Sequence, residues 1–111
     1  MATITDALIQ EITDVIVQTV NPQQVILFGS LACGAGGPDS DLDILIVKDQ
    51  APGLGQSRRQ EMAQLWRLLA RFDISKDILI YSRDEIERWR DTKNHIIAHA
   101  LREGRLLYER S

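Results

Sequence analysis

Two short apolar segments joined by a glycine-rich stretch limit the folds open to this chain. QVILF (residues 24–28) and LDILIV (residues 42–47) are rich in β-branched side chains and have the length of buried strands. The stretch between them begins at Gly29 and leads into Asp41 and Asp43. The pattern predicts two strands of one sheet, connected by a segment that brings polar groups to the sheet.

Apolar residues at spacings of three and four predict two long helices, one before these strands in the sequence and one after them. The first covers residues 3–20 and ends before Asn21-Pro22, and the second covers residues 58–71. Trp66 belongs to the apolar stripe of the second helix, so we expect it in the core. Residues 48–57 contain two glycines and a proline, which predicts a loop.

A third strand and a short helix follow in the sequence. DILIY (residues 77–81) is again apolar and β-branched, and it begins at Asp77. Ser82 and Glu85 have the spacing of a capping box, which predicts a helix that runs to about Trp89.

The end of the chain completes the predicted architecture. A last helix is expected from about Thr92 to Glu103, and RLLYER (residues 105–110) could pair at a sheet edge. The order of elements predicts an α/β (α+β) fold in which helices back a small mixed sheet of three to four strands. At 111 residues we expect a single domain over residues 1–111.

Charge and cysteine content narrow the classes of partner. The formal net charge is -3, from 13 Lys and Arg against 16 Asp and Glu, so binding of duplex nucleic acid is not expected. Cys33 is the single cysteine, which excludes an internal disulfide and favours a cytoplasmic location. No apolar run has the length of a membrane span, so no membrane partner is expected. The sequence does not fix the oligomeric state, and a homo-oligomer stays open.

The aspartates are the strongest candidates for chemistry. Side chains two residues apart on a strand point the same way, with their α-carbons about 6 to 7 Å apart, so Asp41 and Asp43 should repel one another. Mg²⁺ would relieve this repulsion, because it prefers oxygen ligands and typically takes one or two carboxylates while keeping positions for water and phosphate. If the third strand lies beside the second, Asp77 reaches the same face. Three carboxylates could then hold two metal ions and orient a hydroxyl acceptor.

The Gly-Ser turn before the aspartates suits phosphate oxygens. Gly29 lacks a β-carbon, so the backbone amides can approach an anion closely, and Ser30 adds a hydroxyl group. Acids for metal ions beside amides for phosphates predict a site for a nucleoside triphosphate.

The Gly-Ser turn and the three aspartates together resemble the site of the minimal nucleotidyltransferase (MNT) family of the DNA polymerase beta superfamily. LFGSLACGAGGPDSDLDILIV (residues 27–47) carries the signature G-S-x10-D-x-D of that superfamily. KDILIYSRDEIERW (residues 76–89) is similar to its third-aspartate strand and helix, and GRLLYER (residues 104–110) is similar to its tail. The resemblance covers nearly the whole chain.

This resemblance implies a nucleotidyltransferase fold and transfer of a nucleoside monophosphate, AMP from ATP above all, to a hydroxyl group. Asp41, Asp43 and Asp77 would be the catalytic, metal-binding residues for two Mg²⁺ ions. Gly29 and Ser30 would bind the nucleotide. The sequence contains no motif that selects ATP over other nucleoside triphosphates.

The family resemblance also implies a protein partner. Small members are often paired with a helical HEPN-type toxin, which they neutralise as antitoxins, in some systems by adenylylating a toxin tyrosine. Many members have arginine where this chain has Leu31 or Cys33. A catalytically weak or inactive binding module that neutralises its partner by complex formation is therefore the alternative, and an enzyme with a small-molecule or RNA acceptor is a third reading.

His95 and His99 are weaker candidates. Their spacing of four residues on a predicted helix could suit a metal ion, but no third ligand accompanies them in the sequence. We expect them at a surface or interface.

Overall fold

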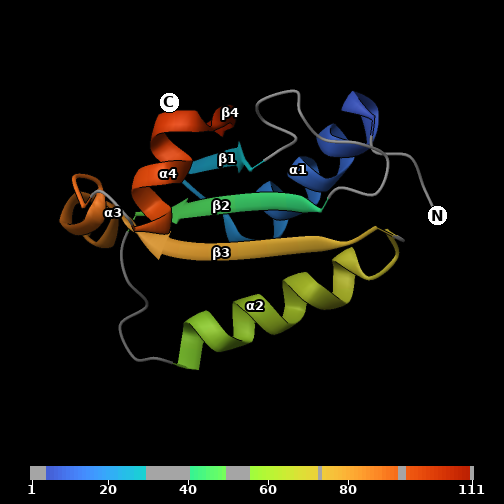
Figure 1. Cartoon of the computed structure of the whole chain (residues 1–111). Coiled ribbons are helices and arrows are strands. Elements are labelled where there is room, and N and C mark those ends of the chain that lie inside the picture. Colours follow the sequence, from blue (N-terminus) through green and yellow to red (C-terminus); the bar gives the residue numbers. More distant parts are fainter. Residues whose placement is uncertain (1–4, 30–40, 50–55, 73, 93–94, 111) are drawn as a thin grey trace.

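The computed structural model describes residues 5–29, 41–49, 56–72, 74–92 and 95–110, and it shows one sheet with helices packed on both faces (Figure 1). The predicted mixed α/β architecture is confirmed. In chain order the elements are α1 (Asp6–Val20), β1 (Gln24–Phe28), β2 (Leu42–Lys48), α2 (Gln56–Leu69), β3 (Lys76–Ser82), α3 (Arg83–Trp89), α4 (Ile96–Glu103) and β4 (Arg105–Glu109).

The sheet has four strands in the order β3-β2-β1-β4. β1 pairs antiparallel with both β2 and β4, whereas β2 pairs parallel with β3. The tail of the chain therefore forms an edge strand, as the sequence predicted. The parallel pairing brings the beginnings of β2 and β3 to the same end of the sheet, where β1 ends.

Local capping sets the ends of the helices. The hydroxyl of Thr5 accepts a hydrogen bond from the amide of Leu8 at 3.1 Å and so begins α1, and Asn21 ends it in the left-handed conformation with φ 48°. The last helix begins at Ile96 rather than near Thr92, so that predicted boundary was wrong. The reason is His95, which is extended and accepts a hydrogen bond at Nδ1 from the amide of Ile97 at 3.1 Å.

Apolar side chains fill both faces of the sheet. The larger cluster joins α1 and α2 to one face, and the smaller cluster joins α3 and α4 to the other, where Leu45 and Val47 of β2 are buried. Lys48 ties three elements together, because its ammonium donates to the carbonyl of Val20 and pairs with Glu61 of α2 at 3.0 Å. In the part of the chain that the structure describes, no helix is both long and apolar enough to cross a membrane.

Candidate active site

Strand register brings two of the predicted acids together. Asp43 lies opposite Phe28 of β1 and opposite Asp77 of β3. Neighbouring strands are about 4.8 Å apart, and paired residues of a parallel ladder project to the same side. Because Asp43 alternates with Leu45 and Val47, the two carboxylates share the sheet face that α3 and α4 cover.

Gly29 fits closely against this pair. It follows the last residue of β1 and has φ 76°, in the region that favours glycine. A β-carbon at this position would lie 2.3 Å from Oδ2 of Asp43, far inside van der Waals contact. The positive φ and the close approach of the Asp43 carboxylate therefore both favour glycine at this position.

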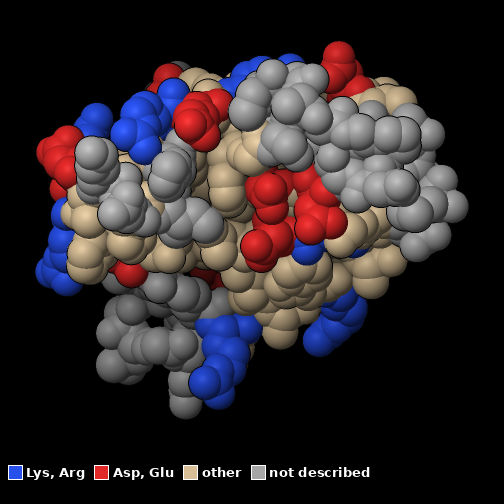
Figure 2. All heavy atoms as spheres, in the orientation of Figure 1, with Lys and Arg blue, Asp and Glu red and all other residues tan. Residues whose placement is uncertain are grey.

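The carboxylates repel one another. The pKa of Asp43 is raised above its usual 3.8, first by partial burial and then by the negative charges of Asp77 and Asp41. The raised pKa links all three predicted acids electrostatically. Figure 2 shows acidic side chains gathered on the face of the molecule seen in Figure 1.

Within the described residues, no Lys or Arg forms an ion pair with any of the three acids. Lys76, which directly precedes Asp77, instead donates to the backbone carbonyls of Phe72 at 2.8 Å and Ile74 at 3.1 Å. Protein cations in the described ranges thus leave the negative charge at this end of the sheet uncompensated.

The donor set fits a hard divalent cation in an open site. Among the residues that the structure describes, no three His, Cys, Asp or Glu side chains are grouped so that they could hold a metal ion, so Asp41, Asp43 and Asp77 do not form a three-ligand cage. Mg²⁺ does not require such a cage, because it commonly binds one or two carboxylates and fills its other positions with water and substrate phosphate. The in-register pair Asp43 and Asp77, with Asp41 nearby, offers ligands of this chemistry.

Some residues singled out from the sequence lie outside the described ranges, and one differs in burial from the prediction. Ser30, Leu31 and Cys33 are outside the described residues. Trp66 was expected in the core, but 37% of its surface is exposed, so that prediction was wrong. Its neighbour Leu65 is fully buried and fills the core position of the apolar stripe instead.

His95 has a structural setting of its own. It caps α4, and its ring stacks on Trp89 with centroids 4.6 Å apart and planes 11° from parallel. It belongs to no group of three metal-binding side chains in the described part of the chain. Trp89 is 36% exposed as a residue, so the stacked pair lies at the surface.

The close contact between Gly29 and Asp43 was not predicted from the sequence. The sequence indicated an open glycine turn for phosphate, but the contact depends on which residue of β2 pairs with Phe28. A glycine directly after a strand and an acid near the start of the next one are the only signals for it.

Comparisons with known proteins agree with this geometry. The sequence profile of the family described as "Polymerase beta, Nucleotidyltransferase" matches residues 10–111. No curated protein sequence matches the chain significantly.

Solved structures with a similar fold include proteins of a toxin–antitoxin system. A toxin–antitoxin structure with AMP-PNP is 21% identical, with a TM-score of 0.59 over 92% of this chain and 74% of that chain. A mutant of the toxin–antitoxin pair MntA-HpeT is 20% identical, with a TM-score of 0.60 over 91% of this chain and 73% of that chain.

A third similar structure, described as a nucleotidyltransferase from Sulfolobus solfataricus, is 21% identical, with a TM-score of 0.62 over 94% of this chain and 79% of that chain. At these identities the structures establish the shared fold, and the family profile spans almost the whole sequence. This chain therefore belongs to the polymerase beta nucleotidyltransferase family.

Proposed function

We propose that this protein is a Mg²⁺-dependent nucleotidyltransferase that moves AMP from ATP to a hydroxyl group and releases pyrophosphate. The observation that carries the proposal is the in-register pair Asp43 and Asp77 beneath the turn at Gly29, where burial first, and then the charges of Asp77 and Asp41, raise the pKa of Asp43. Family membership supports the reaction class, and the similar structure with AMP-PNP supports an adenine nucleotide.

In the proposed site, Asp41 and Asp43 hold Mg²⁺ and Asp77 completes the metal and acceptor site. The turn at Gly29 and Ser30 binds triphosphate oxygens through its backbone amides. When bound, Mg²⁺ neutralises charge that develops on the phosphate oxygens. The acceptor oxygen forms a bond to the α-phosphorus as the bond from that phosphorus to the pyrophosphate oxygen breaks, and Asp77 accepts the hydroxyl proton.

The acceptor in this proposal is a partner protein in the cytoplasm. Two of the similar structures come from toxin–antitoxin pairs, which supports an antitoxin role for this chain. We assign the acceptor to a tyrosine hydroxyl of a HEPN-type helical toxin, in line with the family resemblance of residues 27–47.

The proposal is tested by incubating the protein with α-labelled ATP, Mg²⁺ and its cognate HEPN-type protein. Asp43→Asn and Asp77→Asn should each lower label transfer by about 100-fold or more, because the first removes a charged ligand for Mg²⁺ and the second removes the proton acceptor. Asp84→Asn, at an exposed acid in the first turn of α3, is the matched control and should transfer at the wild-type rate. Full transfer by either active-site variant would refute the assignment.

A binding module is the second candidate function. It is supported by Leu31 and Cys33, which stand where many members of the family have arginine. On this reading Asp43→Asn would still neutralise the partner, and wild-type protein would bind it without transferring label. Measuring neutralisation and transfer in the same samples separates the two functions.

A further inference from the structure

We propose that the surface formed by α1 and α2 is a dimer interface that binds a second copy of this chain through a two-fold axis. The surface consists of the exposed residues of the two helices together with Arg71, which follows α2. The two helices pack side by side against the same face of the sheet. The inference concerns assembly, and it does not depend on the proposed transfer reaction.

The two helices carry opposite charge. α1 contains three acids, Asp6, Glu11 and Asp14, and no Lys or Arg. On the α2 side, Arg59, Arg67 and Arg71 are exposed. The α2 acid Glu61 is already paired with Lys48 at 3.0 Å, so it does not offset these arginines.

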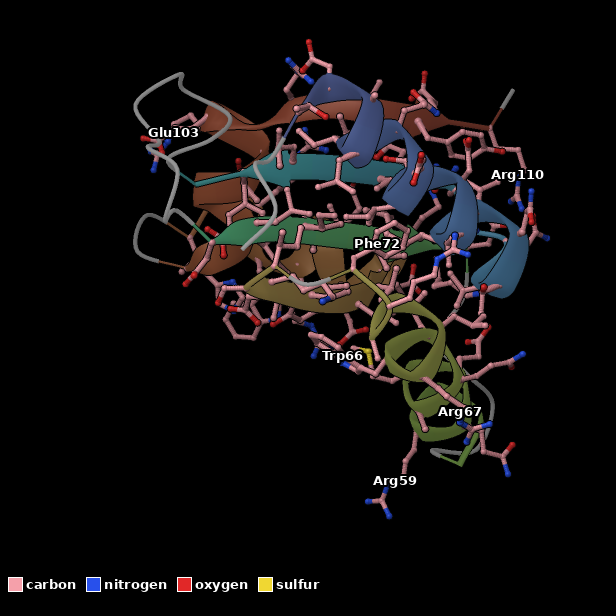
Figure 3. The ribbon with its side chains drawn as sticks, turned by 90° about the vertical axis from the view of Figure 1, so that its right-hand side faces the viewer. Arg59, Trp66, Arg67, Phe72, Glu103 and Arg110 are labelled. Carbon is pink, nitrogen blue, oxygen red and sulfur yellow. The ribbon has the colours of Figure 1, made fainter. Side chains whose placement is uncertain are left out.

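Apart from Asp6, which lies 3.9 Å from the guanidinium of Arg105 on β4, these charges have no ion-pair partner among the described residues. Among the described residues, no ion pair joins an acid of α1 to an arginine of α2, although the helices are in contact. Asp14 accepts a hydrogen bond from its neighbour Gln10 at 2.9 Å, and the guanidinium of Arg71 lies 4.7 Å from the ring centre of Phe72. Figure 3 shows Arg67 on the side of α2 that faces away from the sheet, opposite to Trp66.

A groove lies between the acidic and basic helices. It has a volume of about 420 Å³ and is lined by Val15, Gln18, Thr19, Arg67, Leu68 and Arg71. Leu68 is 43% exposed at this groove, which gives the surface an apolar contact point. The groove thus offers Val15 and Leu68 as apolar contacts and carries arginines on its α2 side, while the acids of α1 lie outside its lining.

Such a surface is self-complementary under two-fold symmetry. When the two-fold axis runs along the groove between the helices, α1 of each copy faces α2 of the other. Each interface then brings acids near Asp14 against arginines near Arg67 twice, which is the pattern of an isologous contact. The opposite charges also select this axis, because a two-fold axis across the groove would place α1 on α1 and α2 on α2, with like charges together.

Sedimentation equilibrium of the full chain tests the proposal. Wild-type protein should dimerise at low salt and dissociate more as NaCl is raised, since exposed charge pairs are screened. Asp14→Arg and Arg67→Glu should each raise the dimer Kd by about 100-fold, because each places like charges opposite one another twice per dimer. Glu103→Arg on α4 and Arg88→Glu on α3 are matched charge reversals on other surfaces, and they should leave the Kd unchanged.

Charge exchange makes the test specific for a second copy. An equimolar mixture of Asp14→Arg and Arg67→Glu should form a 1:1 heterodimer, because each reversed charge then meets an opposite one. A single chain that carries both Asp14→Arg and Arg67→Glu should form a homodimer again. This double variant tests the interface even if one of the single variants folds poorly. Monomeric wild-type protein at low salt, variants that dimerise like wild type, or a mixture that stays monomeric would each overturn the proposal. Monomeric wild type would instead favour an unrelated acidic partner.

Discussion

The polar groups at the two ends of β3 differ in whether they have partners within the protein. At its far end Ser82 is buried, and its hydroxyl accepts from the Glu85 amide at 3.2 Å while the Ser82 amide donates to the Glu85 carboxylate at 3.0 Å. At its beginning, Asp77 lies beside Asp43, and no cation of the described residues pairs with either. At one end the polar groups are paired within the protein itself, whereas at the other we propose that a bound cation balances the negative charge. We therefore assign a structural role to the polar groups of Ser82 and Glu85 and propose a functional role for Asp43 and Asp77.

The largest effect on the fold is expected from Gly29→Ala, at the acidic end. The substitution forces a left-handed conformation on alanine, which costs about 1 to 2 kcal/mol, and its β-carbon would meet Oδ2 of Asp43 at 2.3 Å. We expect a loss of about 2 to 3 kcal/mol in the free energy of unfolding, measured by urea denaturation. An unchanged unfolding curve would show that an added β-carbon at position 29 meets neither backbone strain nor the Asp43 carboxylate.

A smaller loss of stability is expected from Ser82→Ala, at the end of β3 where the capping box begins α3. Removal of the hydroxyl breaks half of the capping box, which should lower the free energy of unfolding by about 1 kcal/mol. Transfer activity should stay at the wild-type level, because the change lies at the opposite end of β3 from Asp77. A large loss of transfer without loss of stability would contradict the separation of the two ends.

The smallest effect, with opposite sign, is expected from Asp43→Asn in metal-free protein. The pKa of Asp43 is raised in the folded state, so its ionisation destabilises the fold, and the neutral amide should raise the melting temperature at pH 7. The advantage should shrink as pH falls through the raised pKa towards 3.8, where the wild-type carboxyl also becomes neutral in both states. Thermal melts of both proteins from pH 7 to pH 4 measure this. A variant less stable than wild type at pH 7 would contradict the repulsion.

The sequence predicted the strands better than the helix ends. QVILF forms β1 with the expected bounds, and β2 and β3 extend the predicted strands by one or two residues. These segments are apolar and β-branched throughout, so their pattern is unambiguous. The last helix was placed too early, because nothing in the sequence indicates that a histidine side chain caps it at His95.

The roles of the candidate site residues stay predictions, and their packing was not predicted from the sequence. The acidic pattern identified Asp41, Asp43 and Asp77, and β2–β3 pairing places the latter two in register. The contact of Gly29 with Asp43 depends on the antiparallel register of β1 and β2, which local sequence does not encode. Exposure of Trp66 depends in the same way on how α2 is rotated against the sheet, because an apolar stripe of this width leaves one edge outside.

Calorimetric titration of Mn²⁺ into the protein, with a nonhydrolysable ATP analogue present, tests most directly whether the carboxylates share a cation. We expect metal binding by wild-type protein and its loss in Asp43→Asn and Asp77→Asn, with Asp84→Asn binding like wild type. Wild-type protein that binds no metal, or Asp43→Asn that binds it with unchanged affinity, would contradict a shared cation at the beginning of β2 and β3.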